Sequence, residues 1–252
     1  MDTVTEISLP NVKEILWQQM HDDIRSFIPH FPDNELMCPA CLRHVTFEQV
    51  SLEHIIPKQS VALDPVEVRE AITRNQRSGL TLLCRKPLVL KGKPIPGSGC
   101  NGWKGTHFDK SVRELLHSEP HTINFNSRHQ VSMFAVGYLA LFSRYGYRVT
   151  LTPSGLLMRR QFFSPNSFLK AVPNKCQMIL SGAPVTQLDE KSKNYWLDPF
   201  KITLEGGSAC VVIRSMVFYL PLSEDPTIPL ARVLHYVPRR YRLCRNLETI
   251  FE

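Results

Sequence analysis

The chain has 252 residues, 43% of them hydrophobic, and a formal net charge of +7. This length allows one large domain or two small ones, each with its own core. The positive charge favours a polyanionic partner such as nucleic acid. No apolar run approaches the roughly 20 residues of a membrane-spanning helix, and the N-terminus lacks a signal peptide's apolar block. We therefore expect a cytoplasmic protein that does not enter a membrane.

The first segment, residues 1–36, is predicted to be helical over residues 10–28. Its apolar side chains recur at helical spacing, and Pro29 and Pro32 follow them. The apolar positions are Val12, Ile15, Leu16, Met20, Ile24, Phe27 and Ile28. This pattern indicates one amphipathic helix.

The second segment, residues 37–117, is rich in Cys, His, Gly and Lys and has little periodicity. Such a composition favours a small domain held together by a metal more than by a core. Within it we expect a short helix at 65–74, a strand at 79–83 and an irregular basic loop at 85–99. A polar link around residues 118–128 follows.

The third segment, residues 128–252, is predicted to be an α+β domain. Helical apolar spacing over 129–145 ends at Gly146, and short apolar runs bounded by Pro and Gly then indicate strands. The expected strands cover 147–152, 176–180, 200–204, 210–219 and 231–237. The fold class of the whole chain is therefore α+β, with mixed or antiparallel strands in this last domain. Its role is left open between target choice, partner binding (including a homodimer) and regulation.

Four of the seven cysteines form a candidate structural zinc site. An odd number of cysteines argues against a closed set of disulfides. Cys38 and Cys41 have the two-residue spacing at which one turn aims both sulfurs at a single ion, and Cys84 and Cys100 are the pair that would complete a tetrahedral site. The alternative is a chance pair beside two unrelated cysteines. The remaining three, Cys176, Cys210 and Cys244, are expected to be buried.

Between the cysteine pairs lies the segment Glu53-His54-Ile55-Ile56-Pro57-Lys58. Asn101 directly follows Cys100 in the sequence Cys-Asn-x-x-Lys-Gly, which we expect to start a helix. Together with the Cys-x-x-Cys pair, these motifs resemble the HNH, or ββα-metal, endonuclease family, in particular its zinc-stapled subset. The resemblance covers residues 37 to about 116.

The resemblance implies a function and a set of site residues. Glu53 and Asn101 would bind a catalytic Mg²⁺ or Mn²⁺, and His54 would be the general base. His107 and Asp109 are candidates for a further metal ligand. No Asn occupies the position that commonly orients the base. Asn75 comes too early in the chain, so a backbone carbonyl near Thr81 is expected in that role.

The implied activity is metal-dependent hydrolysis of phosphodiester bonds, most simply in double-stranded DNA, as in anti-phage defence or restriction. Four lysines are candidate phosphate contacts, with solvated surface lysines as the alternative: Lys58, Lys91, Lys93 and Lys104. Basic residues of the third segment could grip nucleic acid or simply form a charged surface: Arg159, Arg160, Arg239, Arg240 and Arg242 with Tyr241. The alternative function is a zinc-stabilised nucleic-acid-binding or assembly module without catalysis.

Overall fold

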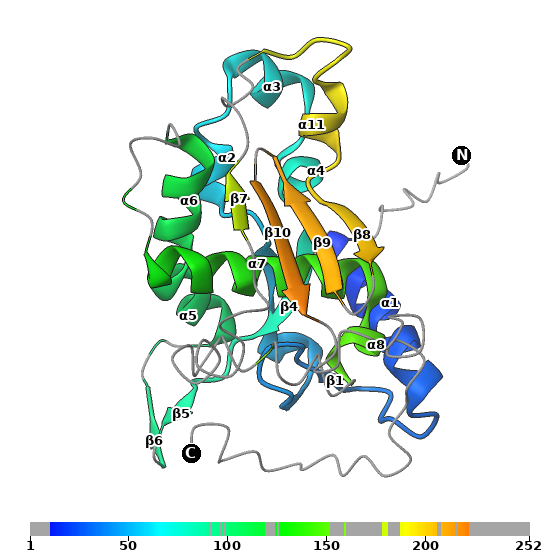
Figure 1. Cartoon of the computed structure of the whole chain (residues 1–252). Helices are drawn as coiled ribbons and strands as arrows, with labels where there is room; N and C mark the ends of the chain where they lie inside the picture. The colour runs from blue at the N-terminus through cyan, green and yellow to red at the C-terminus, as the bar shows by residue number, and fades with distance from the viewer. Residues whose placement is uncertain are drawn as a thin grey trace, which may run out of the picture.

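The helices and strands come from a computed structural model that describes part of the chain. The described residues are 11–90, 92–95, 97, 99–118, 124, 126–151, 159, 178–180, 187–205, 208–214 and 216–221. Within them, helices alternate with small antiparallel sheets (Figure 1). The fold is therefore α+β, as the sequence predicts.

The helices differ greatly in length. They are α1 (Val12–Phe27), the 3-10 helix η1 (Phe47–Gln49), α2 (Lys58–Val61), α3 (Val66–Ala71), α4 (Arg74–Ser78), α5 (Cys100–His107), α6 (Asp109–His117), α7 (Ser127–Tyr145), α8 (Tyr147–Thr150) and α11 (Lys193–Leu197). A capping box starts α1, in which the Asn11 side chain and Glu14 each accept a hydrogen bond from the other's backbone amide. Among the described residues, no helix has the length and apolar character required to cross a lipid bilayer.

The strands form four antiparallel groups. The two-stranded groups are β1 (Leu36–Met37) with β2 (His44–Val45), β3 (Val50–His54) with β4 (Leu80–Cys84), and β5 (Val89–Leu90) with β6 (Lys93–Pro94). The four-stranded sheet has the order β7 (Met178–Leu180), β10 (Met216–Pro221), β9 (Ser208–Ile213), β8 (Lys201–Glu205).

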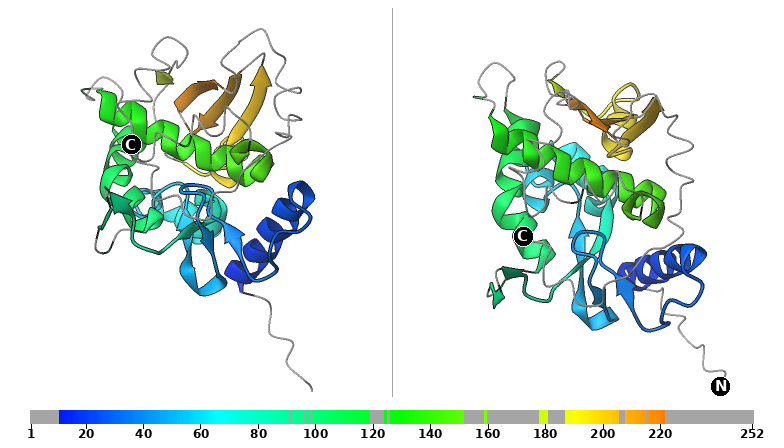
Figure 2. Two further views of the ribbon diagram at one scale, coloured as in Figure 1. Left: turned by 90° about the horizontal axis from the view of Figure 1, so that it is seen from below. Right: turned by 60° about the horizontal axis from the view of Figure 1, so that its bottom comes forward.

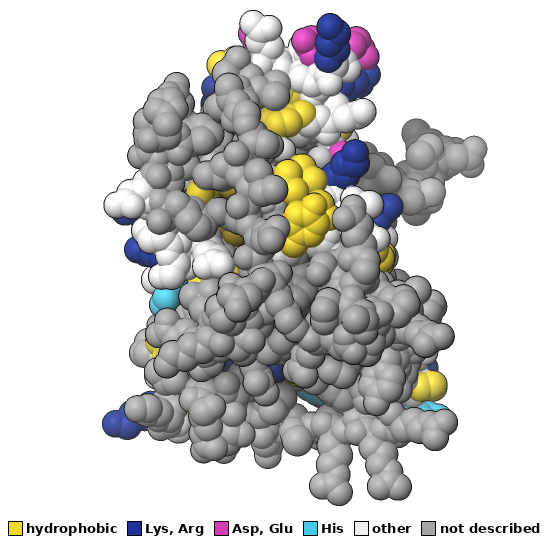
Figure 3. Space-filling view, in the orientation of Figure 1, with side chains coloured by type: hydrophobic (Ala, Val, Ile, Leu, Met, Phe, Trp, Pro, Cys, Tyr) yellow, Lys and Arg dark blue, Asp and Glu magenta, His cyan; other side chains and the backbone are white. Residues whose placement is uncertain are grey.

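Helix α7 is the centre of the molecule. It lies between the four-stranded sheet and the part of the chain that contains α1, β3 and β4 (Figure 2). Nearly all of its side chains from Val131 to Phe142 are buried, which explains why apolar residues occur on every side of this helix. One hydrophobic cluster joins α7 to residues from α1, β4 and β9. The outer face of the sheet also carries apolar side chains, drawn in yellow over β9 and β10 (Figure 3).

Two strand predictions are wrong in detail. Residues 147–150 form the helix α8 instead of a strand, and the Tyr147 amide donates to Asp23 Oδ2 of α1 at 2.5 Å. A short apolar run does not distinguish a strand from a buried helix. The hydrogen bond to α1 satisfies an amide at the start of α8 that the helix itself leaves without a partner. Residues 210–219 form parts of two strands, because the chain turns at Arg214, whose φ is +54°. The strands expected at 79–83 and 200–204 are confirmed as β4 and β8, and residues 231–237 lie outside the described residues.

Candidate metal centre and active site

Strands β3 and β4 form the frame of both candidate sites. Their antiparallel register pairs Val50 with Cys84 at one end and His54 with Leu80 at the other. Helix α5 packs against β4, and the 25-residue connection between the strands, residues 55–79, contains α2, α3 and α4. The cysteines therefore lie at one end of this hairpin, and the Glu-His pair lies at the other.

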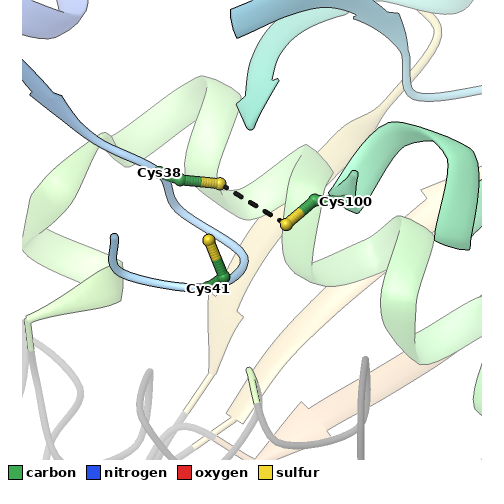
Figure 4. Close-up of side chains that lie close together, drawn as sticks. All are labelled: Cys38, Cys41 and Cys100. Atoms are coloured by element: carbon green, nitrogen blue, oxygen red, sulfur yellow. Dashed lines mark hydrogen bonds between the residues drawn. The ribbon is translucent and has the colours of Figure 1, made fainter. Parts of the chain in front are cut away.

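Three cysteines at the first end form a group that could hold a metal ion such as zinc. The sulfurs of Cys38, Cys41 and Cys100 lie within 4.8 Å of one another and are buried (Figure 4). The Sγ atoms of Cys38 and Cys100 are 3.9 Å apart. This agrees with about 3.8 Å between two sulfurs that each bind one tetrahedral zinc at 2.3 Å.

Cys84 lies next to this group but outside its tightest part. Its backbone amide donates to Cys38 Sγ at 3.4 Å, and its thiol lies within hydrogen-bonding reach of the thiols of Cys41 and Cys100. The contact with the Cys100 thiol alone would lower the pKa of Cys84, but the Cys41 thiol and burial outweigh it and raise that pKa to about 11. Cys100 therefore belongs to the closest group of sulfurs, despite its wide spacing from Cys84 in the sequence, and Cys84 lies beside that group.

Two backbone features bring the sulfurs together. The Leu42 amide donates to Cys38 O at 2.8 Å, and Leu42 has a left-handed φ of +59°, so the chain folds back tightly around the first two cysteines. Gly99 lies where the end of β4 meets the start of α5. A Cβ there would be 2.6 Å from both Arg85 Cα and Cys84 O, so only glycine allows Cys100 to approach Cys84 this closely.

Arg43 supplies positive charge to the sulfurs and was not singled out by the sequence. Its Nε donates to Cys41 Sγ at 3.3 Å and its second terminal nitrogen to Cys84 Sγ at 3.2 Å. Burial disfavours a thiolate, but hydrogen bonds from the other three thiols and the charge of Arg43 lower the pKa of Cys41 well below its usual value. Cys41 is therefore stabilised as a thiolate, the form that binds metal, whereas burial raises the pKa of Cys38 and Cys100.

At the other end of the hairpin, Glu53 belongs to a buried network of three charges. Lys104 Nζ lies 2.8 Å from Glu53 Oε1 and 2.7 Å from Asp109 Oδ1, and it also donates to His54 O at 3.1 Å. Burial raises the pKa of Glu53 despite this partner. Burial alone would lower the pKa of Lys104, but the two carboxylates outweigh it and raise that pKa.

This network corrects the expectation for Lys104. Its side chain is completely buried, so its ammonium group cannot contact a phosphate in this structure. The reason is the carboxylate pair: a buried lysine is stable only when its charge is neutralised, and Glu53 and Asp109 do this. Asp109 thus touches Lys104 and reaches Glu53 only through it.

Asn101 faces the same strand as Glu53. Its Nδ2 donates to Ser51 Oγ at 3.1 Å and to Leu52 O at 3.2 Å. These contacts join the first turn of α5 to β3 immediately before the Glu-His pair. The described contacts include none between Asn101 and the side chains of Glu53 or His54.

His54 lines an open pocket of about 570 Å³. The imidazole is buried, and neither ring nitrogen has a hydrogen-bond partner among the described residues. Burial lowers the pKa of His54 to about 4, and the positive charges of Lys58 and Arg74 add to this effect. The side chain of Asn75 comes close enough to the ring to oppose the fall, although it does not reach hydrogen-bond geometry with either ring nitrogen. The ring is therefore neutral at pH 7 and able to accept a proton.

The pocket is strongly basic. Besides His54 and Leu52 it is lined by Lys58, Val61, Ala62, Arg69, Arg74, Asn75 and Arg77. Of these, only Lys58 was a predicted phosphate contact, and the arginines were missed. The available signal was the run of cations from residue 58 to residue 77, whose convergence depends on how three short helices fold back on each other.

The other candidate residues lie elsewhere. His107 stacks on Trp103 at 3.8 Å between ring centroids, and the structure brings it into no group of metal-ligating side chains among the described residues. Lys93 is exposed in β6. Arg159 is buried and donates to Ala40 O at 3.1 Å, so it supports the cysteine turn and does not face a polyanion. The other predicted contacts lie outside the described residues: Lys91, Arg160, Arg239, Arg240, Tyr241 and Arg242.

Comparison of the chain with protein-family models, with curated proteins and with solved structures finds no match.

Proposed function

We propose that the chain is a metal-dependent nuclease that hydrolyses phosphodiester bonds in DNA, with an HNH-like site at the His54 end of the β3–β4 hairpin. The observation that carries the proposal is His54 itself: its buried, neutral imidazole, which has no hydrogen-bond partner in the part of the chain that the structure describes, lines a pocket rich in cations. A buried polar group without a partner is costly and is typical of a site that acts on a ligand. The order of two antiparallel strands and a packed helix also fits the resemblance seen in the sequence.

The cysteine end would hold a structural zinc through Cys38, Cys41, Cys84 and Cys100. The sulfur separations support this assignment for Cys38, Cys41 and Cys100, and the thiolate stabilised at Cys41 supports it further. The contacts of Cys84 support the fourth ligand. A zinc there would join the turn after β1 to the start of α5, and so fix α5 against the hairpin.

The His54 end would hold the second, catalytic cation through oxygen atoms of Glu53 and Asn101. The donor set fits Mg²⁺ or Mn²⁺, because both prefer carboxylate and amide oxygens. Lys104 contacts Oε1 of Glu53, and a carboxylate has a second oxygen for a cation. When bound, the cation would stabilise negative charge on the phosphate and on the leaving oxygen.

The chain's own residues would carry the proton transfer. An imidazole nitrogen of His54 takes a proton from water while the water oxygen attacks phosphorus, and the bond from phosphorus to the 3′ oxygen then breaks. Asn75, beside the ring, is the side chain that would orient His54, in place of a backbone carbonyl near Thr81.

Cleavage of supercoiled plasmid tests the proposal. With Mg²⁺ or Mn²⁺, we expect the intact chain to nick the plasmid and His54→Ala to be slower by at least about 100-fold, the usual contribution of a general base. His107→Ala is the matched control, because it removes an exposed histidine from the same region. Equal cleavage by His54→Ala and the unmodified chain would refute the role of His54.

The ion pair between Lys104 and Glu53 favours a second candidate function, a zinc-stabilised nucleic-acid-binding module without catalysis. In that case Lys104 permanently occupies the place of a cation. Binding of duplex DNA in EDTA, combined with no cleavage at any concentration of Mg²⁺ or Mn²⁺, would support this function over hydrolysis.

A further inference from the structure

The connection between β3 and β4 presents three cations on one pocket wall. Lys58 starts α2, Arg69 is in α3 and Arg74 starts α4. All three are exposed and all line the pocket that His54 enters. Within the described part of the chain, none of them forms an ion pair with a carboxylate, although Arg69 makes one long contact with Ala62 O at 3.4 Å.

Among the residues that the structure describes, the pocket wall carries no carboxylate. The fourth cation, Arg77, is already paired with Asp64. Three unpaired cations around a neutral imidazole create a field that binds an anion with several oxygens. The two arginines, on different helices, could each donate two hydrogen bonds to a phosphate.

We propose that Lys58, Arg69 and Arg74 form a phosphodiester-binding subsite that holds the nucleic-acid backbone beside the bond facing His54. This inference rests on the proposed function and deepens it, because it assigns binding of the substrate's phosphates to residues 55–79 instead of to Lys91, Lys93 and Lys104. A sugar-phosphate backbone is the fitting ligand, since its repeated charges match cations spread over three helices.

Equilibrium binding of a fluorescein-labelled DNA duplex in EDTA tests the subsite without requiring catalysis. For the double variant Arg69→Gln/Arg74→Gln, we expect at least tenfold weaker binding. The slope of log K against log salt should fall in magnitude by about 1.8, because each lost phosphate contact removes about 0.9. Lys193→Gln, an exposed cation of α11 away from the pocket, is the control and should leave both quantities unchanged.

The outcomes separate this subsite from the nuclease proposal. Weaker binding by the double variant supports the subsite even if the unmodified chain cuts no DNA. Unchanged affinity and slope in the double variant would overturn the subsite, even if the unmodified chain cuts DNA efficiently.

A different observation links the four-stranded sheet to this pocket. Arg214, at the turn between β9 and β10, binds both oxygens of Asp64, with NH1 2.7 Å from Oδ1 and NH2 2.9 Å from Oδ2. Asp64 also pairs with Arg77 Nε at 3.1 Å. All three side chains are at most 4% exposed, so this is a buried bidentate pair with a second arginine.

Arg77 connects Asp64 to the pocket wall. Its guanidinium donates to the carbonyls of Val68 and Ile72 in and after α3, and Arg77 itself lines the pocket. The ring of Trp196 in α11 lies 5.0 Å from the Arg214 guanidinium and packs with Val68 and Ile72. Figure 1 shows α3 and α4 next to α11 accordingly.

We infer that Arg214 is a positioning residue through which the four-stranded sheet holds the phosphodiester-binding wall in place. Arg214→Met should weaken duplex binding in EDTA by about as much as the double variant does, and should speed amide exchange over residues 66–78 while zinc content stays constant. Arg214→Lys, which keeps the charge but loses the bidentate contact, should give an intermediate effect.

A double-mutant cycle distinguishes positioning from general stability. If Arg214 acts through the wall, Arg214→Met should cost little further affinity in the Arg69→Gln/Arg74→Gln background. Fully additive losses, or unchanged amide exchange over residues 66–78 in both Arg214 variants, would overturn this role.

Discussion

The two ends of the β3–β4 hairpin have opposite physical characters. At the Cys84 end, four thiols are buried against one another and against Arg43. At the His54 end, the imidazole is buried beside an open basic pocket and has no hydrogen-bond partner among the residues described. The first arrangement satisfies its groups internally once a metal is bound, and the second leaves groups that only a ligand could satisfy. Under the proposed function, the same hairpin therefore has a stabilising end and a reactive end.

The largest expected effect breaks the stabilising end. Cys38→Ser or Cys100→Ser removes a sulfur from the tightest part of the cluster, and we expect loss of bound zinc together with loss of cooperative unfolding of the hairpin region. Zinc content by mass spectrometry and thermal unfolding by circular dichroism measure this. Cys210→Ser, in β9 and outside the cluster, should retain zinc. Full zinc content in Cys38→Ser would contradict the assignment.

A smaller loss should follow from Lys104→Met. This change leaves the carboxylates of Glu53 and Asp109 without their shared partner, which costs about 3–5 kcal/mol for a buried pair. Urea unfolding at pH 7 measures the loss, and Lys110→Met, which changes an exposed lysine of α6, is the control. The raised pKa of Glu53 means that the folded state binds its proton more readily than the unfolded state, so lowering the pH should recover part of the stability. If Lys104 contacted phosphate instead, Lys104→Met would be as stable as the unmodified chain both at pH 7 and at the lower pH.

The smallest effect concerns protons at the reactive end. The pKa of His54 is lowered to about 4, below its usual 6.5, so the unfolded state takes up this proton first as the pH falls. The His54 contribution should therefore reduce stability as the pH falls from 6.5 to 4. Nuclear magnetic resonance titration of the ring should give a midpoint near 4, and Arg74→Gln should move it upward. A midpoint near 6.5 would mean that the ring is solvated and the reactive end is not as described.

Local patterns predicted the elements that are regular by themselves. The helix of residues 10–28 and the long helix ending at Gly146 follow from apolar spacing and caps, and the cysteine cluster follows from spacing in the chain. The ion pairs of Lys104 did not follow, because the local sequence of a helix does not show whether a lysine faces solvent or lies between two carboxylates. Arg69, Arg74 and the Arg214–Asp64 pair depend on contacts across long stretches of chain, 150 residues in the last case, which periodicity does not encode.

Metal counting at the two ends tests the central claim most directly. We expect one zinc per chain that survives dialysis against EDTA, and one weaker Mn²⁺ site, detected by electron paramagnetic resonance, that Glu53→Gln abolishes while the zinc remains. Zinc without any Mn²⁺ site, or Mn²⁺ binding unchanged in Glu53→Gln, would contradict a hairpin with one stabilising and one reactive end.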